Sequence, residues 1–82
     1  MTSASANPSK LAILFRDIAT LGGKDASFMA NVILHHHQRP MTKLRGLLKL
    51  LRAGHRIRTA SFSLNVLVID DQRTEWSRLE EA

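Results

Sequence analysis

Basic side chains recur within one short segment at spacings of four, three and four residues: Arg45, Lys49, Arg52 and Arg56. On an α-helix these spacings place the side chains on one face, because each residue turns the helix by about 100°. Cations that follow one another a turn apart can meet successive phosphates of a nucleic acid, which gives affinity without reading bases. The segment therefore predicts a phosphate-binding helix face, although Arg56 lies beyond the expected end of the helix.

The distribution of charge along the chain supports this interpretation. The 82 residues carry a formal net charge of +5, yet residues 26–69 contain no Asp or Glu. The basic residues of that stretch, which we predict to bind nucleic acid, are Arg39, Lys43, Arg45, Lys49, Arg52, Arg56 and Arg58. Residues 70–82 hold five acids against two arginines. Such a positive field favours a polyanion or an acidic protein surface as partner.

Apolar residues recur with helical period in three segments, and the basic row belongs to the third of them. The first predicts a helix over residues 8–21, which begins after Asn7 and ends at Gly22-Gly23. The second predicts a helix over residues 26–37, which must end before Pro40. Leucines in the third predict a helix over residues 41–53, with Thr42 as its N-cap. Helix, short turn and basic helix in this order predict a helix-turn-helix-like core.

The last third of the sequence changes character. Apolar and polar residues alternate from Ser61 to Val68, which predicts a strand over residues 61–69, and a shorter strand at 56–59 is possible. A helix through the same residues is the rival interpretation. The orientation we expect places Val66 and Val68 inward and Leu67 and Ile69 outward. Residues 73–81 are expected to form a short terminal helix with Trp76 and Leu79 facing inward.

The predicted fold class is mainly α, of the α+β type: a three-helix, helix-turn-helix-like core, one or two short strands and a short C-terminal helix. Residues 1–7 are expected to be a flexible lead-in, and residues 8–82 a single small domain. A chain of 82 residues without cysteine has a small core and no disulfide to reinforce it. Because the predicted strand is apolar on both faces, we expect a homodimer or a bound partner to cover it.

Three consecutive histidines, His35 to His37, offer nitrogen ligands but not a metal site. Neighbouring helical residues point about 100° apart, whereas two histidines converge on a metal at a spacing of four. We expect His36 to pack against the core, and His35 and His37 to extend the basic surface. No metal and no other cofactor is predicted.

Sequence patterns of catalysis and of membrane insertion are missing. The chain has no cysteine, no G-x-S-x-G motif and no phosphate-binding glycine loop, so we expect a non-enzymatic protein without a small-molecule substrate. No apolar run approaches the roughly 20 residues of a membrane span. The N-terminus lacks the pattern of a signal peptide, so a cytoplasmic location, within a host cell if the protein is of viral type, is expected.

Two functions follow from these observations. The first is a small nucleic-acid-binding regulator that grips the phosphates of DNA, or recognises the shape of RNA, with the basic helix. The alternative is an inhibitor or adaptor, of the kind made by phages and viruses, that binds and blocks a larger host protein or nucleoprotein complex. For that alternative the predicted contact residues are Leu67, Ile69 and Trp76, together with the basic face.

Overall fold

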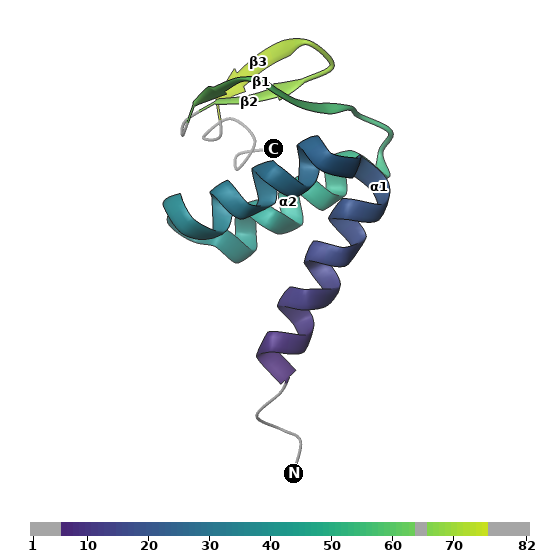
Figure 1. Cartoon of the computed structure of the whole chain (residues 1–82), viewed down its shortest axis with the longest axis vertical. Coiled ribbons are helices and arrows are strands. Elements are labelled where there is room, and N and C mark those ends of the chain that lie inside the picture. The colour runs from purple at the N-terminus through teal and green to yellow at the C-terminus, as the bar shows by residue number, and fades with distance from the viewer. Residues whose placement is uncertain (1–5, 64–65, 76–82) are drawn as a thin grey trace.

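The computed structural model describes the backbone of residues 6–63 and 66–75, and the side chains of residues 9–58 and 67–75. Within these ranges the elements follow in the order α1 (Ala6–His36), α2 (Pro40–Arg52), β1 (Ile57–Ser63), β2 (Val66–Ile69) and β3 (Gln72–Glu75). The two helices pack together, and the sheet lies against them as a second layer (Figure 1). This confirms the mainly helical α+β class, while the expected three separate helices are not confirmed.

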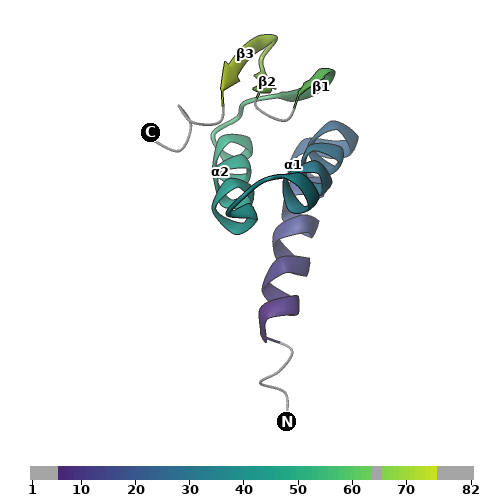
Figure 2. The ribbon, with the colours of Figure 1, turned by 90° about the vertical axis from the view of Figure 1, so that its left-hand side faces the viewer.

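Helix α1 joins the first two predicted helices and bends between them. Its continuity is interrupted at Gly23, whose φ of 70° and ψ of −152° lie in a region that essentially only glycine adopts. The glycine pair was expected to end a helix and begin a loop. Instead the second half of α1 starts at the bend itself, and the two halves run in different directions (Figures 1 and 2).

Gly22, the other glycine of the pair, is required by packing. A Cβ atom added at Gly22 would lie 2.9 Å from Leu51 Cδ2 and would also collide with the Cβ of Ala26. The bend in α1 and the C-terminal turn of α2 therefore meet at van der Waals distance because residue 22 has no side chain.

Helix α2 agrees closely with its predicted bounds, although it begins at Pro40 with Arg39 as N-cap, so Thr42 lies inside it. Its buried residues are the four leucines that set the pattern: Leu44, Leu47, Leu48 and Leu51. The helix ends in a Schellman motif, in which the backbone N–H groups of Gly54 and His55 donate to the carbonyls of Leu51 and Leu50. Gly54, with φ of 96°, supplies the left-handed residue that this motif needs.

The second half of α1 and helix α2 lie side by side and run in opposite directions, joined by residues 37–39 (Figures 1 and 2). This is an antiparallel helical hairpin. A DNA-reading helix-turn-helix differs from it, because its two helices meet at about 90–120°. The predicted helix-turn-helix geometry is therefore not confirmed.

The sheet has the strand order β1-β2-β3, with both pairings antiparallel. One strand over residues 61–69 was predicted; the structure has two strands in that region, and the shorter strand expected at 56–59 merges into β1. Asp70 and Asp71, with φ values of 50° and 69°, form the tight turn between β2 and β3. The terminal helix expected from residue 73 is wrong for residues 73–75, which belong to β3, and its remainder lies outside the described residues.

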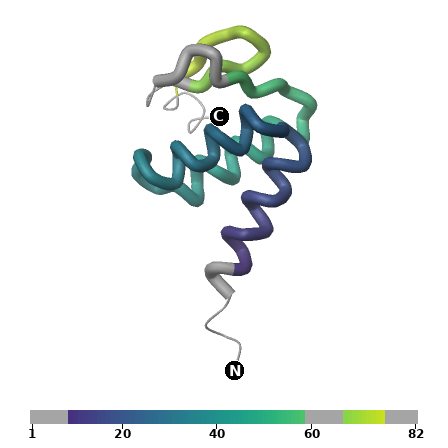
Figure 3. The backbone as a smooth tube through the Cα atoms, in the orientation of Figure 1, coloured from purple at the N-terminus to yellow at the C-terminus, as the bar shows by residue number. Residues whose placement is uncertain are grey.

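Both layers share one core. Helix α1 contributes Ile18, Met29 and Ile33, α2 its four leucines, and the sheet Ile57 and Leu67. The backbone passes from the end of α2 across to β1, which contacts α1 (Figure 3). Two residues of the apolar stripes that predict the first two helices are not buried: Leu21 and Phe28 are about half exposed, at 51% and 50%. They lie just before and after the bend, where the change of direction displaces the apolar stripe.

Candidate nucleic-acid interface

Three of the predicted cations form one exposed row on α2. Arg45, Lys49 and Arg52 are all solvent-exposed, and their spacing of four and three residues aligns them on one flank of the helix. The row spans roughly 10 Å along the helix axis, at 1.5 Å per residue. Because the buried leucines of α2 fix the helix against α1, the cations project from a rigid support.

The row lies next to the first half of α1. Arg52 Nη2 is 3.7 Å from Asp17 Oδ2, and Arg16 Nη2 is 3.5 Å from Asp17 Oδ1. Asp17 therefore brings a negative charge to one end of the row. The two arginines are exposed and Asp17 is half-buried at the surface, so each ion pair contributes at most about 1 kcal/mol to the free energy of unfolding.

Arg39 and Lys43 lie apart from the row. Arg39 is exposed in the connection before α2 and has a left-handed backbone, with φ of 54°. Lys43 projects from the other flank of α2, where its Nζ atom donates a hydrogen bond to the carbonyl of Gln38 at 3.0 Å. These two cations therefore belong to the start of α2 and do not extend the row.

Arg56 and Arg58 follow the end of α2, in a different setting. Both are exposed, Arg56 in the connection to β1 and Arg58 within the strand. The Arg58 Nη1 atom lies 2.9 Å from Asp71 Oδ1. Arg58, Val68 and Arg73 are paired across the three strands and so share the sheet face turned away from the helices. The Schellman motif ends the helix before residue 56, so Arg56 does not continue the row.

Asp70 ties the β2–β3 turn to the connection that follows α2. Its Oδ2 atom is 2.9 Å from His55 Nδ1, and its Oδ1 atom accepts a hydrogen bond from the backbone N–H of Arg56 at 3.0 Å. The Asp70 N–H in turn donates to the Arg56 carbonyl at 2.8 Å. The hydrogen bond with His55, and then that from Arg56, hold the pKa of Asp70 below its ordinary value of 3.8.

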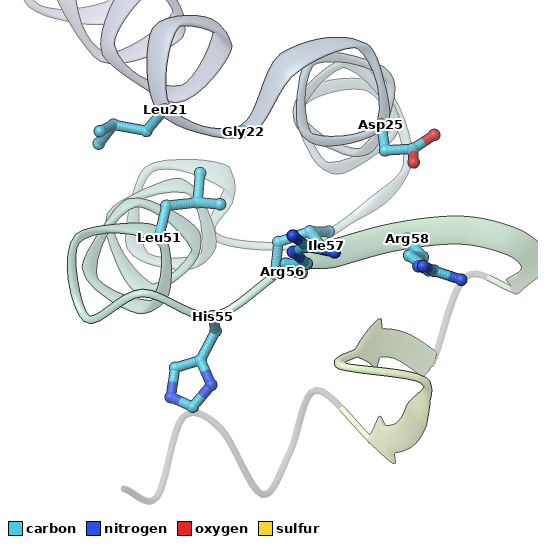
Figure 4. Close-up of a pocket in the computed structure, with 8 residues that line it drawn as sticks. All are labelled: Leu21, Gly22, Asp25, Leu51, His55, Arg56, Ile57 and Arg58. Atoms are coloured by element: carbon cyan, nitrogen blue, oxygen red, sulfur yellow. The ribbon is translucent and has the colours of Figure 1, made fainter.

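A pocket of about 340 Å³ opens where the bend of α1, the end of α2 and the start of β1 meet (Figure 4). Leu51 points from α2 toward the bend, while His55 points away from α1. The lining is mixed in charge, because it includes Asp25 of α1 as well as Arg56 and Arg58. This mixture makes the pocket a poorer anion site than the row on α2.

A second hollow, of about 230 Å³, lies between the first half of α1 and α2. Its lining residues are Lys10, Ile13, Leu14, Asp17, Met41, Arg45 and Leu48. We call it the α1–α2 groove. The bend of α1 and the end of α2 meet at Gly22 and Leu51. From there the first half of α1 runs away from α2 (Figures 1 and 2), and the groove lies between these two segments.

The residues predicted to contact a protein partner are placed differently from expectation. Leu67 is fully buried, and Ile69 packs against the core, so the orientation predicted for this strand is wrong. Alternation alone does not say which face is inward; the pairing of Ile69 with the buried Ile57 decides it. Val68, on the opposite face, is only 8% exposed. The homodimer or bound partner that we expect to cover this strand stays a prediction. Trp76 lies outside the described residues.

The histidine triplet also differs from expectation. His36 is exposed, as is His35, and His37 is half-buried beyond the end of α1. The first two continue the last turn of a solvent-facing helix end, so the core contact expected for His36 is wrong. Within the ranges whose side chains are described, no three His, Asp or Glu residues are grouped so that they could hold a metal ion.

Sequence reasoning missed two features of the interface. Lys10 and Asp17, on α1, border the groove next to the α2 row, and no local pattern connects them with a segment 30 residues away. The hydrogen bonds of Asp70 with His55 and with the backbone of Arg56, which we call the Asp70 clasp, were also missed. A pair of acids directly after an apolar strand is a turn signal, and it could have predicted the hairpin.

The chain matches no protein-family model, no curated protein and no solved structure. In the part of the chain that the structure describes, neither helix has the combination of length and apolar character that crossing a membrane requires.

Proposed function

We propose that this protein is a non-enzymatic nucleic-acid-binding regulator that holds phosphates with the exposed row of α2. The observation that carries the proposal is the alignment of Arg45, Lys49 and Arg52 on one flank of a well-packed helix. A nucleic-acid strand advances about 3.4 Å per nucleotide along the duplex axis, so a row of roughly 10 Å faces about three steps.

Two further supports come from charge and rigidity. The stretch from residue 26 to residue 69 contains no acid that could neutralise the row from within α2. The four buried leucines fix α2, and cations on a fixed helix lose less conformational freedom on binding than cations on a loop. Arg56, beyond the end of α2, is a further exposed cation, whereas Arg39 and Lys43 lie apart from the row and are not part of the proposed contact.

The contacts proposed are to the phosphate backbone. Base readout uses bidentate side chains that enter the major groove, and the antiparallel hairpin does not present α2 as a helix-turn-helix does. The proposed activity is therefore largely independent of base sequence, and duplex DNA and duplex RNA are both substrates for the test.

The test compares two variants with the same change of charge. Arg45→Glu with Lys49→Glu reverses two of the three charges of the row, whereas Lys24→Glu with Arg73→Glu changes two exposed cations elsewhere. Fluorescence anisotropy with labelled duplexes at about 50 mM salt should show that the first variant loses binding by about a hundredfold or more. The second should lose much less. Equal losses would mean that total charge, and not the row, provides the affinity; wild-type protein that does not bind would refute the proposal.

A further inference from the structure

The α1–α2 groove combines an apolar floor with cationic borders. Leu14 and Leu48 are buried at its base, Met41 is half-buried, and Ile13 remains 47% exposed. Lys10 borders the groove from α1 and Arg45 from α2, and both are exposed. The exposed Ile13 beside the buried leucines is apolar surface that a partner could cover.

From this arrangement we infer that the groove is a docking site for an acidic amphipathic helix of another protein. A cavity of about 150 Å³ holds a benzene molecule, so the volume of about 230 Å³ accommodates one large apolar side chain. An amphipathic helix binds a groove through apolar anchor side chains on one face, and one such anchor would occupy this volume with carboxylates of the same helix on both sides of it. The carboxylates would meet Lys10 on one border and Arg45 on the other.

The charges around the groove favour an acidic helix over a second copy of the chain as its occupant. The described helical segments carry more basic than acidic residues, so two copies would bring like charges together. Asp17 lies at one end of the groove, where its carboxylate is close to Arg16 and Arg52. We therefore expect the acidic side chains of the partner to lie toward Lys10 and Arg45, away from Asp17.

This docking site is distinct from the proposed nucleic-acid interface, but the two meet at Arg45. Lys49 belongs to the row and does not line the groove, whereas Ile13 lines the groove and carries no charge. An acidic helix in the groove would engage Arg45 and add negative charge beside the row. It should therefore compete with nucleic acid, which makes the groove a regulatory site.

The experiment uses a designed peptide of roughly four helical turns, with leucines on one face and glutamates on both flanks. A scrambled peptide of the same composition is the control. Binding to the full-length protein is measured by anisotropy of the labelled peptide. We expect the amphipathic peptide to bind at least about tenfold more tightly than the scrambled one.

Two matched substitutions locate the peptide. Ile13 and Leu21 are equally exposed on α1, at 47% and 51%, but Leu21 lies outside the groove. Ile13→Ser should weaken peptide binding by about tenfold and leave nucleic-acid binding unchanged, while Leu21→Ser should change neither by more than about twofold. Lys49→Gln should weaken nucleic-acid binding more than peptide binding, so each proposal can fail separately.

Three results would overturn the inference. The first is equal binding of the amphipathic and scrambled peptides, which would reduce the interaction to charge. The second is an equal effect of Ile13→Ser and Leu21→Ser. The third is self-association of the wild-type protein in sedimentation that Ile13→Ser abolishes, which would assign the groove to a second copy.

Discussion

Arg52 of α2 and Asp17 of α1 are 35 residues apart in the sequence, yet their side chains approach to 3.7 Å. The contact brings a carboxylate to the end of the basic row, so a phosphate that binds there must approach a negative charge. The same contact joins the first half of α1 to α2 beside the groove. Under the proposed function Asp17 should therefore weaken the affinity for phosphates, while its ion pair with Arg52 contributes slightly to the packing of the two helices.

Replacing Asp17 with asparagine should strengthen nucleic-acid binding. The substitution removes one negative charge within reach of Arg52, and a gain of about two- to fivefold is expected at low salt, with less at high salt. The free energy of unfolding should fall by less than about 1 kcal/mol, because both partners are partly exposed. Anisotropy titrations and urea unfolding measure the two effects; weaker binding by Asp17→Asn would show that the phosphate does not lie near Arg52.

Lys49→Gln should reduce the salt dependence of nucleic-acid binding. Each phosphate that a cation neutralises contributes about 0.9 to the slope of log K against log salt concentration for B-DNA. Removing Lys49 from the middle of the row should therefore flatten the slope by about 0.9. Lys24 is an exposed lysine directly after the bend in α1 and is not part of the row. Lys24→Gln is therefore the control and should leave the slope unchanged.

The glycine pair gives a test of the bend in α1. Gly22→Ala should lower the free energy of unfolding by about 1–3 kcal/mol, because the added Cβ meets Leu51 and Ala26. Gly23→Ala should lower it by a similar amount, about 1–3 kcal/mol, although nothing lies within 4 Å of the added atom, because alanine is strained at φ 70°.

Gly46→Ala is the matched control for both glycines. Gly46 lies within α2, and a Cβ atom added there also meets nothing within 4 Å. Alanine at this position should raise the free energy of unfolding by about 0.5–1 kcal/mol, because it favours the helix. Urea denaturation of the three variants measures the differences. An unchanged stability of Gly23→Ala would show that α1 does not bend at this residue.

The Asp70 clasp should make stability depend on acid pH. The hydrogen bond with His55, followed by that from the Arg56 N–H, lowers the pKa of Asp70 from 3.8 in the folded protein. The ionised carboxylate thus stabilises the fold at and above the ordinary pKa. This contribution is lost as the pH falls through the lowered pKa, since the proton binds the unfolded chain more tightly.

Asp70→Asn isolates this effect, because asparagine tolerates the left-handed backbone of the turn as well as aspartate does. The variant should melt at a lower temperature than the wild type at neutral pH, and the difference should shrink below pH 3.8. Asp71→Asn is the control, since Asp71 occupies the same turn and loses only an exposed ion pair with Arg58. Equal melting temperatures of the wild type and Asp70→Asn at neutral pH would contradict the role of the clasp.

The sequence predicted helix α2 well because two independent patterns coincide there. Four leucines fix its buried face, and Gly54 marks its end, so neither the bounds nor the exposure of Arg45, Lys49 and Arg52 depended on the rest of the fold. The bend at Gly23 was harder to predict from the sequence. A glycine pair is compatible with a loop or with a turn between two helical segments, and tertiary contacts such as that of Gly22 with Leu51 decide between them.

The sheet could be predicted only in part, for a physical reason. Alternating residues indicate a strand but not which face is buried, and Leu67 was assigned to the wrong face for that reason. The contact of Arg52 with Asp17 and the Asp70 clasp join distant segments. Contacts of this kind depend on how the elements pack, and no spacing within one segment encodes them.

The most direct measurement is a titration of the wild-type protein with duplex DNA and duplex RNA over a salt series from about 50 to 200 mM. If α2 holds phosphates with the three cations of its row, log K should fall linearly with log salt concentration, with a slope of about −2.7 or steeper for DNA. Absence of binding at about 50 mM salt, or binding that does not change with salt, would contradict phosphate contact by α2.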